Sequence, residues 1–393
     1  MKSNIAKIYT FSALRVLILF YSFDKVFLQL QGLSITQVVL IEVVYIVTIL
    51  LFEVPSGALS DRWSRKYVLS LSCLFFILYI IAFAMGSDFW AFSLGALLAG
   101  VGSALLSGTD TSILFDTLKE LKLEDTYEKY LGRKRAIAAL SYVLAASIGG
   151  FVGKRYGLEA AFWLSLPSMF IAGGVALSLK EPKFHRSTNE VNYWQHVQMT
   201  YSFLVRQPRF LHFAVLITAV TVPMLIFDEY AQVYYAFLGA GAIALGLLGS
   251  VGSAFDAIFN TVTFWFKRFR HDFLFGTMLI IFSLGFVSTW LFQSFIGAAL
   301  LIMSTLAFYI IEITAMADIN RQLPSKIRAT SESFFSLVTQ VVHVPAILMF
   351  GLISQRYSSA AGFGGLGLLL CLYTCYYWVV TVQRINPRGK IES

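Results

Sequence analysis

Long apolar runs separated by short polar turns recur along the whole chain. A bilayer core about 30 Å thick is crossed by roughly 20 residues of helix, and most of the runs have this length. They predict an all-α membrane protein with twelve transmembrane helices, over residues 5–31, 35–56, 67–86, 90–117, 134–153, 159–179, 209–236, 240–265, 273–292, 295–321, 329–353 and 361–384. A β-barrel would show alternating segments of roughly ten residues instead, so the continuous runs favour helices.

Composition and charge add the expected orientation. Only 13% of the 393 residues are charged, against about 25% in soluble domains. With a cytoplasmic N-terminus, most of the 30 Lys and Arg residues fall in inner loops and tails, and Lys25, Lys154, Arg155 and Arg356 fall outside. The positive-inside rule therefore predicts an inner-membrane protein with both termini in the cytoplasm. The net charge of +8 is spread over the inner loops and does not indicate nucleic-acid binding.

A weak internal repeat accompanies a central loop. Similar residues recur at an offset of just over 200 positions: Phe23-Asp24 with Phe227-Asp228, Trp63, Arg65 and Lys66 with Trp265, Lys267 and Arg268, Asp110 and Asp116 with Glu312 and Asp318, and Arg155-Tyr156 with Arg356-Tyr357. The repeat predicts two pseudo-symmetric six-helix bundles, 1–180 and 209–393, related by an axis along the membrane normal. The linker 181–208 is either a helix on the membrane surface or a simple tether.

The loop between the second and third predicted helices carries the most specific motif. It reads "FEVPSGALSDRWSRK" over residues 52–66. Its Gly57, Asp61, Arg62, Arg65 and Lys66 resemble the signature G-x-x-x-D-[RK]-x-G-[RK]-[RK] of the major facilitator superfamily, with Ser64 replacing the second glycine. The preceding "FEVPSG" resembles a motif of bacterial drug-efflux-like members. The resemblance implies the twelve-helix fold of that superfamily and secondary transport by alternating access.

The resemblance also implies a conformational latch. Asp61, Arg65 and Asp116 would form a charged triad that docks near Ala329, at the start of the eleventh helix, and holds the two bundles together. Gly57 would allow close approach of a neighbouring helix. The alternative is a solvated inner loop with the usual basic residues. Two other motifs of drug antiporters are incomplete, because the fourth helix lacks the expected arginine and "AASIGGFVG" in the fifth lacks the proline.

Ionisable residues inside the predicted helices are candidates for substrate or proton binding. A charge at membrane depth costs at least about 2.5–3.5 kcal/mol, so each one is expected to face a cavity or a partner. The candidates are Asp24, Arg15, Asp110, Asp228, Glu312, Glu42 and Asp256. Burial favours the protonated form of a carboxylate, so an acid among them is expected to load and release a proton as the cavity changes its exposure. For any single residue, a packed polar group in a helix interface is the alternative.

Three classes of function remain open. The first is a proton-coupled exporter of small amphipathic or cationic organic compounds. The second is an importer of a metabolite or a siderophore-like anion anchored by Arg15, and the third is a lipid-handling or sensor protein. No nucleotide-binding loop, nucleophile constellation or metal-ligand motif occurs in the sequence, so we expect neither a pump nor an enzyme, and no cofactor. The expected partners are a small-molecule substrate, protons and the lipid bilayer, with the chain acting as a monomer.

Overall fold

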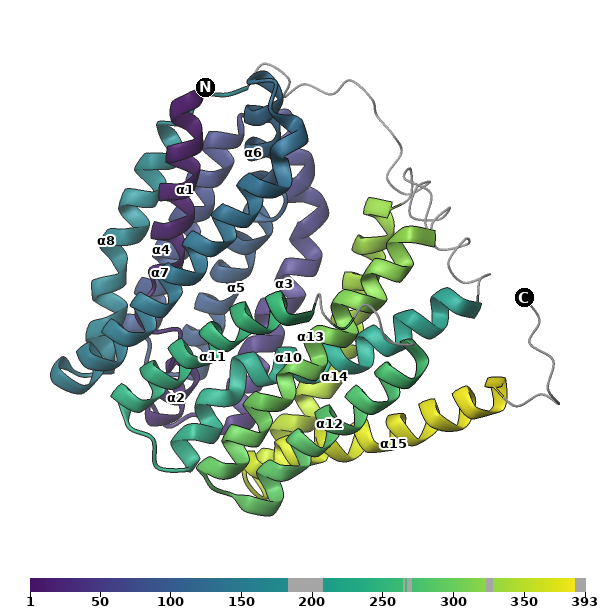
Figure 1. Cartoon of the computed structure of the whole chain (residues 1–393). Helices are drawn as coiled ribbons and strands as arrows, with labels where there is room; N and C mark the ends of the chain where they lie inside the picture. The colour runs from purple at the N-terminus through teal and green to yellow at the C-terminus, as the bar shows by residue number, and fades with distance from the viewer. Residues whose placement is uncertain (183–207, 264–265, 267–270, 323–327, 386–393) are drawn as a thin grey trace. The chain divides into compact units, whose positions relative to one another are not determined.

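The computed structural model describes residues 1–182, 208–263, 266, 271–322 and 328–385 (Figure 1). The described residues form helices joined by short turns and contain no β-strand. Eleven helical stretches among them are long and apolar enough to cross a membrane. The predicted all-α membrane class is therefore confirmed.

The helices follow most of the predicted spans closely, with larger differences at four of them. They are α1 (Lys2–Val16), α2 (Asp24–Leu30), α3 (Ile35–Arg62), α4 (Arg65–Met85), α5 (Phe89–Leu106), α6 (Thr109–Glu120), α7 (Tyr127–Tyr156), α8 (Leu158–Leu177), α10 (Pro208–Phe237), α11 (Ala242–Val262), α12 (His271–Phe292), α13 (Phe295–Gln322), α14 (Arg328–Arg356) and α15 (Ser359–Ile385). The first and fourth predicted helices are each divided, the first between α1 and α2 and the fourth between α5 and α6. Helix α3 extends six residues beyond its predicted end at 56, and α7 begins seven residues before its predicted start at 134.

The chain packs as two compact units. The first contains Met1–Asn189 together with Ala240–Ala254, and the second contains Glu190–Gly239 together with Phe255–Ser393. Helix α11 is therefore divided between the units, and its first half packs with the N-terminal residues. The sequence-based division at residues 181–208 and the two-bundle symmetry stay predictions.

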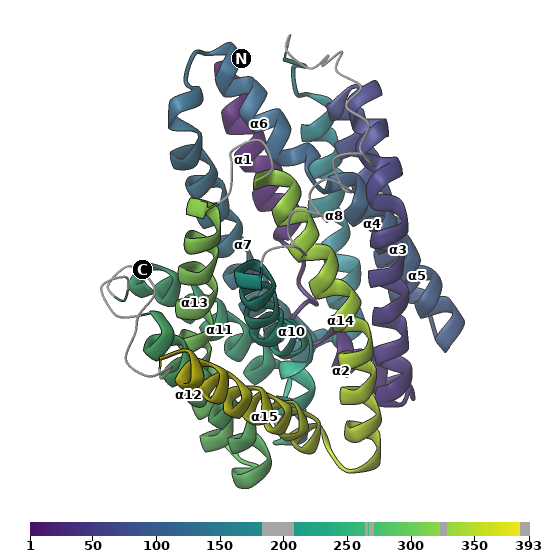
Figure 2. The same ribbon diagram turned by 90° about the vertical axis from the view of Figure 1, so that its right-hand side faces the viewer.

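In the first unit, α3, α4 and α5 run side by side and α8 packs against α4 (Figure 1, Figure 2). The core between these helices is aromatic. Phe20 stacks on Phe162 with ring centroids 3.9 Å apart, and Phe27 lies 4.7 Å from the same ring. Such ring pairs add to the stabilisation from burial alone.

In the second unit, α12 lies beside α13 and α15, and α10 packs against α13, α14 and α15 (Figure 2). An aromatic group again fills the core. Phe363 lies 4.9 Å from Phe350 and 6.1 Å from Phe286, measured between ring centroids. Each unit therefore has its own apolar interior.

The first predicted helix, 5–31, is broken. Helix α1 ends at Val16, α2 begins at Asp24, and the residues between them form turns. Irregular backbone at membrane depth is tolerated only where protein satisfies its polar groups. Two serines of α8 do this here: Ser165 Oγ accepts from the backbone N–H of Leu19 at 2.9 Å, and Ser168 Oγ donates to the carbonyl oxygen of Leu17 at 2.9 Å. The expectation of one continuous helix is wrong for this reason.

Helix α7 passes directly against the break. A Cβ atom added at Gly149 would lie 1.7 Å from the carbonyl oxygen of Leu19. No side chain fits between these two backbones, so Gly149 permits the contact because it has none.

We predict that Gly149→Ala destabilises the protein by about 1–3 kcal/mol or more, because the added methyl group overpacks against backbone. Gly132→Ala in the same helix is the matched control, since an added Cβ at Gly132 meets no described atom within 4 Å. Alanine there should be neutral or stabilising by up to about 1 kcal/mol. Thermal unfolding of the purified protein in detergent compares the two, and equal midpoints would contradict the close contact.

Candidate functional site

A buried three-residue cluster joins α2 to α3 in the first unit. Lys25 Nζ lies 2.6 Å from Glu42 Oε2 and 3.2 Å from Asp24 Oδ2, and the three side chains are at most 10% exposed. The cluster unites two predicted site residues, Asp24 and Glu42, with Lys25, which the sequence analysis counted among the basic residues on the outer side. Lys25 belongs to α2 and is buried, and its ammonium group pairs with the two carboxylates.

A second ion pair joins α6 to α7. Lys134 Nζ donates to Asp110 Oδ2, and Lys134 is only 6% exposed. Sequence analysis began the fifth transmembrane helix at residue 134, but α7 begins at Tyr127, two turns earlier. Lys134 therefore lies within the helix and neutralises Asp110, a candidate for proton binding.

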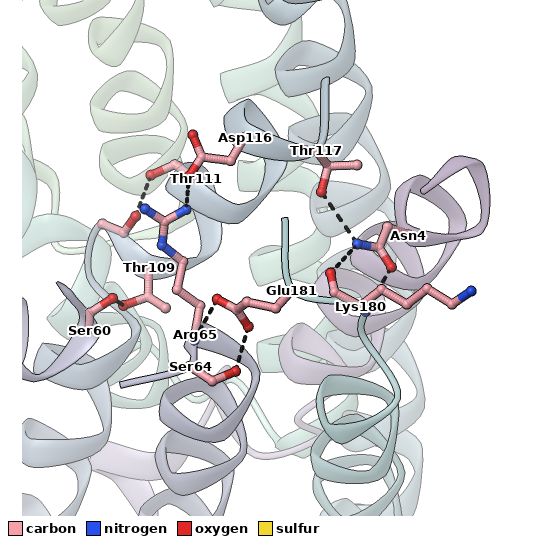
Figure 3. A network of polar contacts seen from close by, with 11 residues as sticks. Asn4, Ser60, Ser64, Arg65, Thr109, Thr111, Asp116, Thr117, Lys180 and Glu181 are labelled. Atoms are coloured by element: carbon pink, nitrogen blue, oxygen red, sulfur yellow. Dashed lines mark hydrogen bonds and ion pairs between the residues drawn. The ribbon is translucent and has the colours of Figure 1, made fainter. Parts of the chain in front are cut away.

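The third ion pair belongs to the signature loop (Figure 3). Arg65, the first residue of α4, donates through its guanidinium to Asp116 Oδ2 on α6. Glu181 completes the arrangement, because its carboxylate accepts from the Arg65 backbone N–H at 3.0 Å and from Ser64 Oγ at 2.5 Å. A carboxylate on the free N–H groups of a helix start is a stabilising cap. Sequence reasoning missed Glu181, which follows the last apolar residues of α8 without any motif of its own.

The segment that carries Glu181 is itself held in place (Figure 3). Asn4 Nδ2 donates to the carbonyl oxygen of Lys180 at 2.7 Å, and Asn4 Oδ1 accepts from the Lys180 backbone N–H at 3.0 Å. Lys7 Nζ donates to the carbonyl oxygen of Ser178 at 2.5 Å. The first residues of α1 thus hold the segment that follows α8 beside the signature loop.

Other predicted latch residues are described only in part. The side chains of Asp61, Arg62 and Ala329 lie outside the described residues. Lys66 Nζ lies 4.9 Å from the ring centroid of Tyr67. A Cβ added at Gly57 would meet no described atom within 4 Å. The structure therefore brings together two members of the expected triad, Arg65 and Asp116.

The second unit holds a group of three acids from three helices. Asp256 on α11 accepts a hydrogen bond from the hydroxyl of Tyr309 on α13. Asp228 on α10 lies close enough to Asp256 and to Glu312 for their charges to interact. Asp228 is exposed, whereas Asp256 and Glu312 are half-buried. The structure thus gathers three of the predicted site residues, and Tyr309 joins them one helical turn before Glu312.

The long stretches that carry these acids contain no Lys or Arg; Arg209 is the second residue of α10 and Arg321 the second-last residue of α13. The sequence contains no Lys or Arg over 210–266, 271–320, 329–355 or 357–383. In the first unit, by contrast, Lys25, Lys134 and Arg65 neutralise the carboxylates of the described spans. The two units therefore differ in the basic residues that lie near their acids in the membrane-spanning stretches.

Arg15 near the end of α1 is the remaining candidate. It is half-buried, and its Nε has no hydrogen-bond partner among the described residues. Its charge acts on the nearby thiol of Cys73 on α4. No ion pair within the described part of the chain includes Arg15, so the structure leaves its charge available to an anion.

We predict that Asp110 and Lys134 act as a structural pair. Either Asp110→Asn or Lys134→Met alone should cost about 3–5 kcal/mol of stability, because each leaves an uncompensated buried charge or donor. The double variant should recover most of that loss. Thermal unfolding of the four proteins gives the coupling energy, and strictly additive losses would contradict a structural pair.

The comparisons with known proteins agree with this fold. The chain is 25% identical over 152 residues to the inner membrane transport protein YajR of Escherichia coli, covering 39% of this chain and 32% of that protein. It is 24% identical over 166 residues to multidrug resistance protein 1 of Bacillus subtilis, covering 42% and 40%. The crystal structure of the nucleoside transporter NupG superposes with a TM-score of 0.77 at 12% identity, covering 97% of both chains.

These relatives match the chain over less than half of their own length, and NupG shows only that the fold is shared. The family model is more extensive: the model of the Major Facilitator Superfamily matches residues 8–346. The chain therefore belongs to the major facilitator superfamily of membrane transporters.

Proposed function

We propose that this protein is a proton-coupled secondary transporter that exports small amphipathic or cationic organic compounds by alternating access. The observation that carries the proposal is the group of Asp228, Asp256 and Glu312 in the second unit, in stretches 210–266 and 271–320 that contain no Lys or Arg. We further propose that the chain acts as a monomer in the inner membrane, with both termini in the cytoplasm.

The physical basis is the cost of a charged carboxylate at membrane depth. Such a group is stable only when it is protonated, faces water or binds a cation. The three acids are then neutral when they hold protons and negatively charged when they release them. A proton and a cationic compound compete for the same carboxylates, and this competition couples their movements in opposite directions.

Similarity offers modest support for export. The name of the Bacillus subtilis relative refers to multidrug resistance, and the match covers 42% of this chain. The incomplete antiporter motifs of the fourth and fifth transmembrane helices weigh against a typical drug antiporter. The acids, rather than the motifs, support a cationic substrate.

A second candidate is a proton-coupled importer of a small metabolite or a siderophore-like anion. Arg15 favours it, because its guanidinium Nε is buried without a hydrogen-bond partner among the described residues. An Arg guanidinium binds carboxylates and phosphates in a bidentate manner. Uptake of an anionic compound that Arg15→Gln abolishes would favour this candidate over export.

We predict that Asp228→Asn, Asp256→Asn and Glu312→Gln each reduce gradient-driven accumulation roughly tenfold or more, since 1.4 kcal/mol of lost differential binding is a factor of ten. Exchange of substrate without a gradient should persist. The measurement is uptake of labelled organic cations into proteoliposomes under an imposed pH gradient. Asp125→Asn, at an exposed position before α7, is the control. Transport by the unaltered protein that ignores the pH gradient would overturn proton coupling.

We also propose that Asp61, Arg65 and Asp116 form a latch that stabilises one conformation of the transport cycle. The ion pair between Arg65 and Asp116 and the Glu181 cap on α4 support this role, because they hold the signature loop in one geometry. The alternative is an inner loop whose charges only set topology.

For the latch, we expect Asp61→Asn to insert into the membrane normally and to lose most transport, because a neutral amide weakens the attraction to Arg65. Membrane abundance and proteoliposome uptake are measured together, with Asp125→Asn again as the control. Normal transport by Asp61→Asn would refute the latch. The alternative would then remain, in which the charges of this inner loop only set the topology of the chain.

A further inference from the structure

We propose that Lys25 is a tethered cation, which fills a monovalent-cation site built by Asp24 and Glu42. The ammonium group takes the position that a sodium ion or a small amine would otherwise occupy. The first unit therefore needs no external cation at this position. This inference stands apart from the proposed direction of transport and from the acids of the second unit.

The geometry of the cluster is that of an occupied cation site. Two carboxylate oxygens from different helices approach one ammonium nitrogen, at 2.6 Å from Glu42 and 3.2 Å from Asp24. An ammonium is a compact point charge with three donors. Hard cations likewise bind carboxylate oxygens, so the same two ligands suit either occupant.

The cluster is also closed to exchange with bulk ions. Its three side chains are 9–10% exposed. The buried Tyr79 of α4 lies close enough to interact with all three charges. Without the lysine, two like charges would share one low-dielectric site, which is unfavourable unless a cation enters or a proton binds.

The chain itself delivers the cation. Lys25 directly follows Asp24, and α2 begins where the broken segment of the first helix ends. A covalently attached ligand has a high effective concentration at its site, so dissolved ions compete poorly with it. The break therefore has a specific consequence, since it places a lysine in a site between two helices.

Among the ion pairs that the structure describes, this is the one in which a single ammonium serves two carboxylates. Lys134 contacts one, Asp110, and so does Arg65 with Asp116. Removal of Lys134 would leave one carboxylate, a weaker cation site. Lys134→Ala is therefore a matched control for Lys25→Ala.

The test is the thermal stability of the full-length protein in detergent, in choline, sodium or methylammonium chloride at equal ionic strength. The unaltered protein should unfold at one temperature in all three salts. Lys25→Ala should unfold about 5 °C lower or more in choline, which is too large to enter. Sodium or methylammonium should restore most of that loss with saturation, as binding to the folded state requires.

Two further variants show whether the carboxylates are the ligands. Lys25→Ala combined with Glu42→Gln should lose the specific recovery, and Lys134→Ala should not show it. The proposal is overturned if Lys25→Ala keeps full stability in choline, if no salt restores it, or if the double variant recovers equally. Should Lys25→Ala fail to fold in choline, the yield of monodisperse protein in each salt replaces the midpoint, and equal yields would contradict the proposal.

Discussion

The low dielectric of the membrane interior constrains every charged residue of this protein. A carboxylate at membrane depth must have a cationic partner, bind a proton or face water. In the first unit the partners are built in, as Lys25, Lys134 and Arg65. In the second unit, residues 210–266 and 271–320 contain acids and no Lys or Arg, and the arginines lie near helix ends. We propose that the same constraint separates structural acids from acids that exchange protons or bind substrate.

A second constraint acts on the backbone. The turns between Val16 and Asp24 expose peptide groups that no helix satisfies, and the hydroxyls of Ser165 and Ser168 replace the missing partners. Gly149 then allows α7 to lie against the same segment. The break is therefore a supported element of the fold, and it determines where Asp24 and Lys25 point. The packing of α7 and the buried charge cluster of Asp24 and Lys25 therefore both depend on this break in the helix.

Apolar run length was enough to predict eleven of the helices, because each run matches the bilayer thickness and ends in polar residues. The broken helix escaped prediction because "VLILFYSF" contains neither glycine nor proline. Lys25 was counted on the outer side and Lys134 among the inner loops and tails, since the positive-inside rule assigns each lysine to a side of the membrane without regard to a buried partner. Pairings such as Asp110 with Lys134 join residues 24 positions apart on two helices, and no local pattern encodes them. The sequence therefore identified the candidate acids, but it did not show which of them form ion pairs with a lysine or arginine.

Infrared difference spectroscopy of the purified protein between acidic and alkaline pH tests the central claim most directly, because it detects the carbonyl band of protonated carboxylic acids. We predict that the band change becomes smaller when Asp228, Asp256 and Glu312 are replaced together by their amides, while the other carboxylates continue to titrate. It should keep its size when Asp24 and Asp110 are replaced. A band change that keeps its size with the first set of substitutions and becomes smaller with the second would contradict the account.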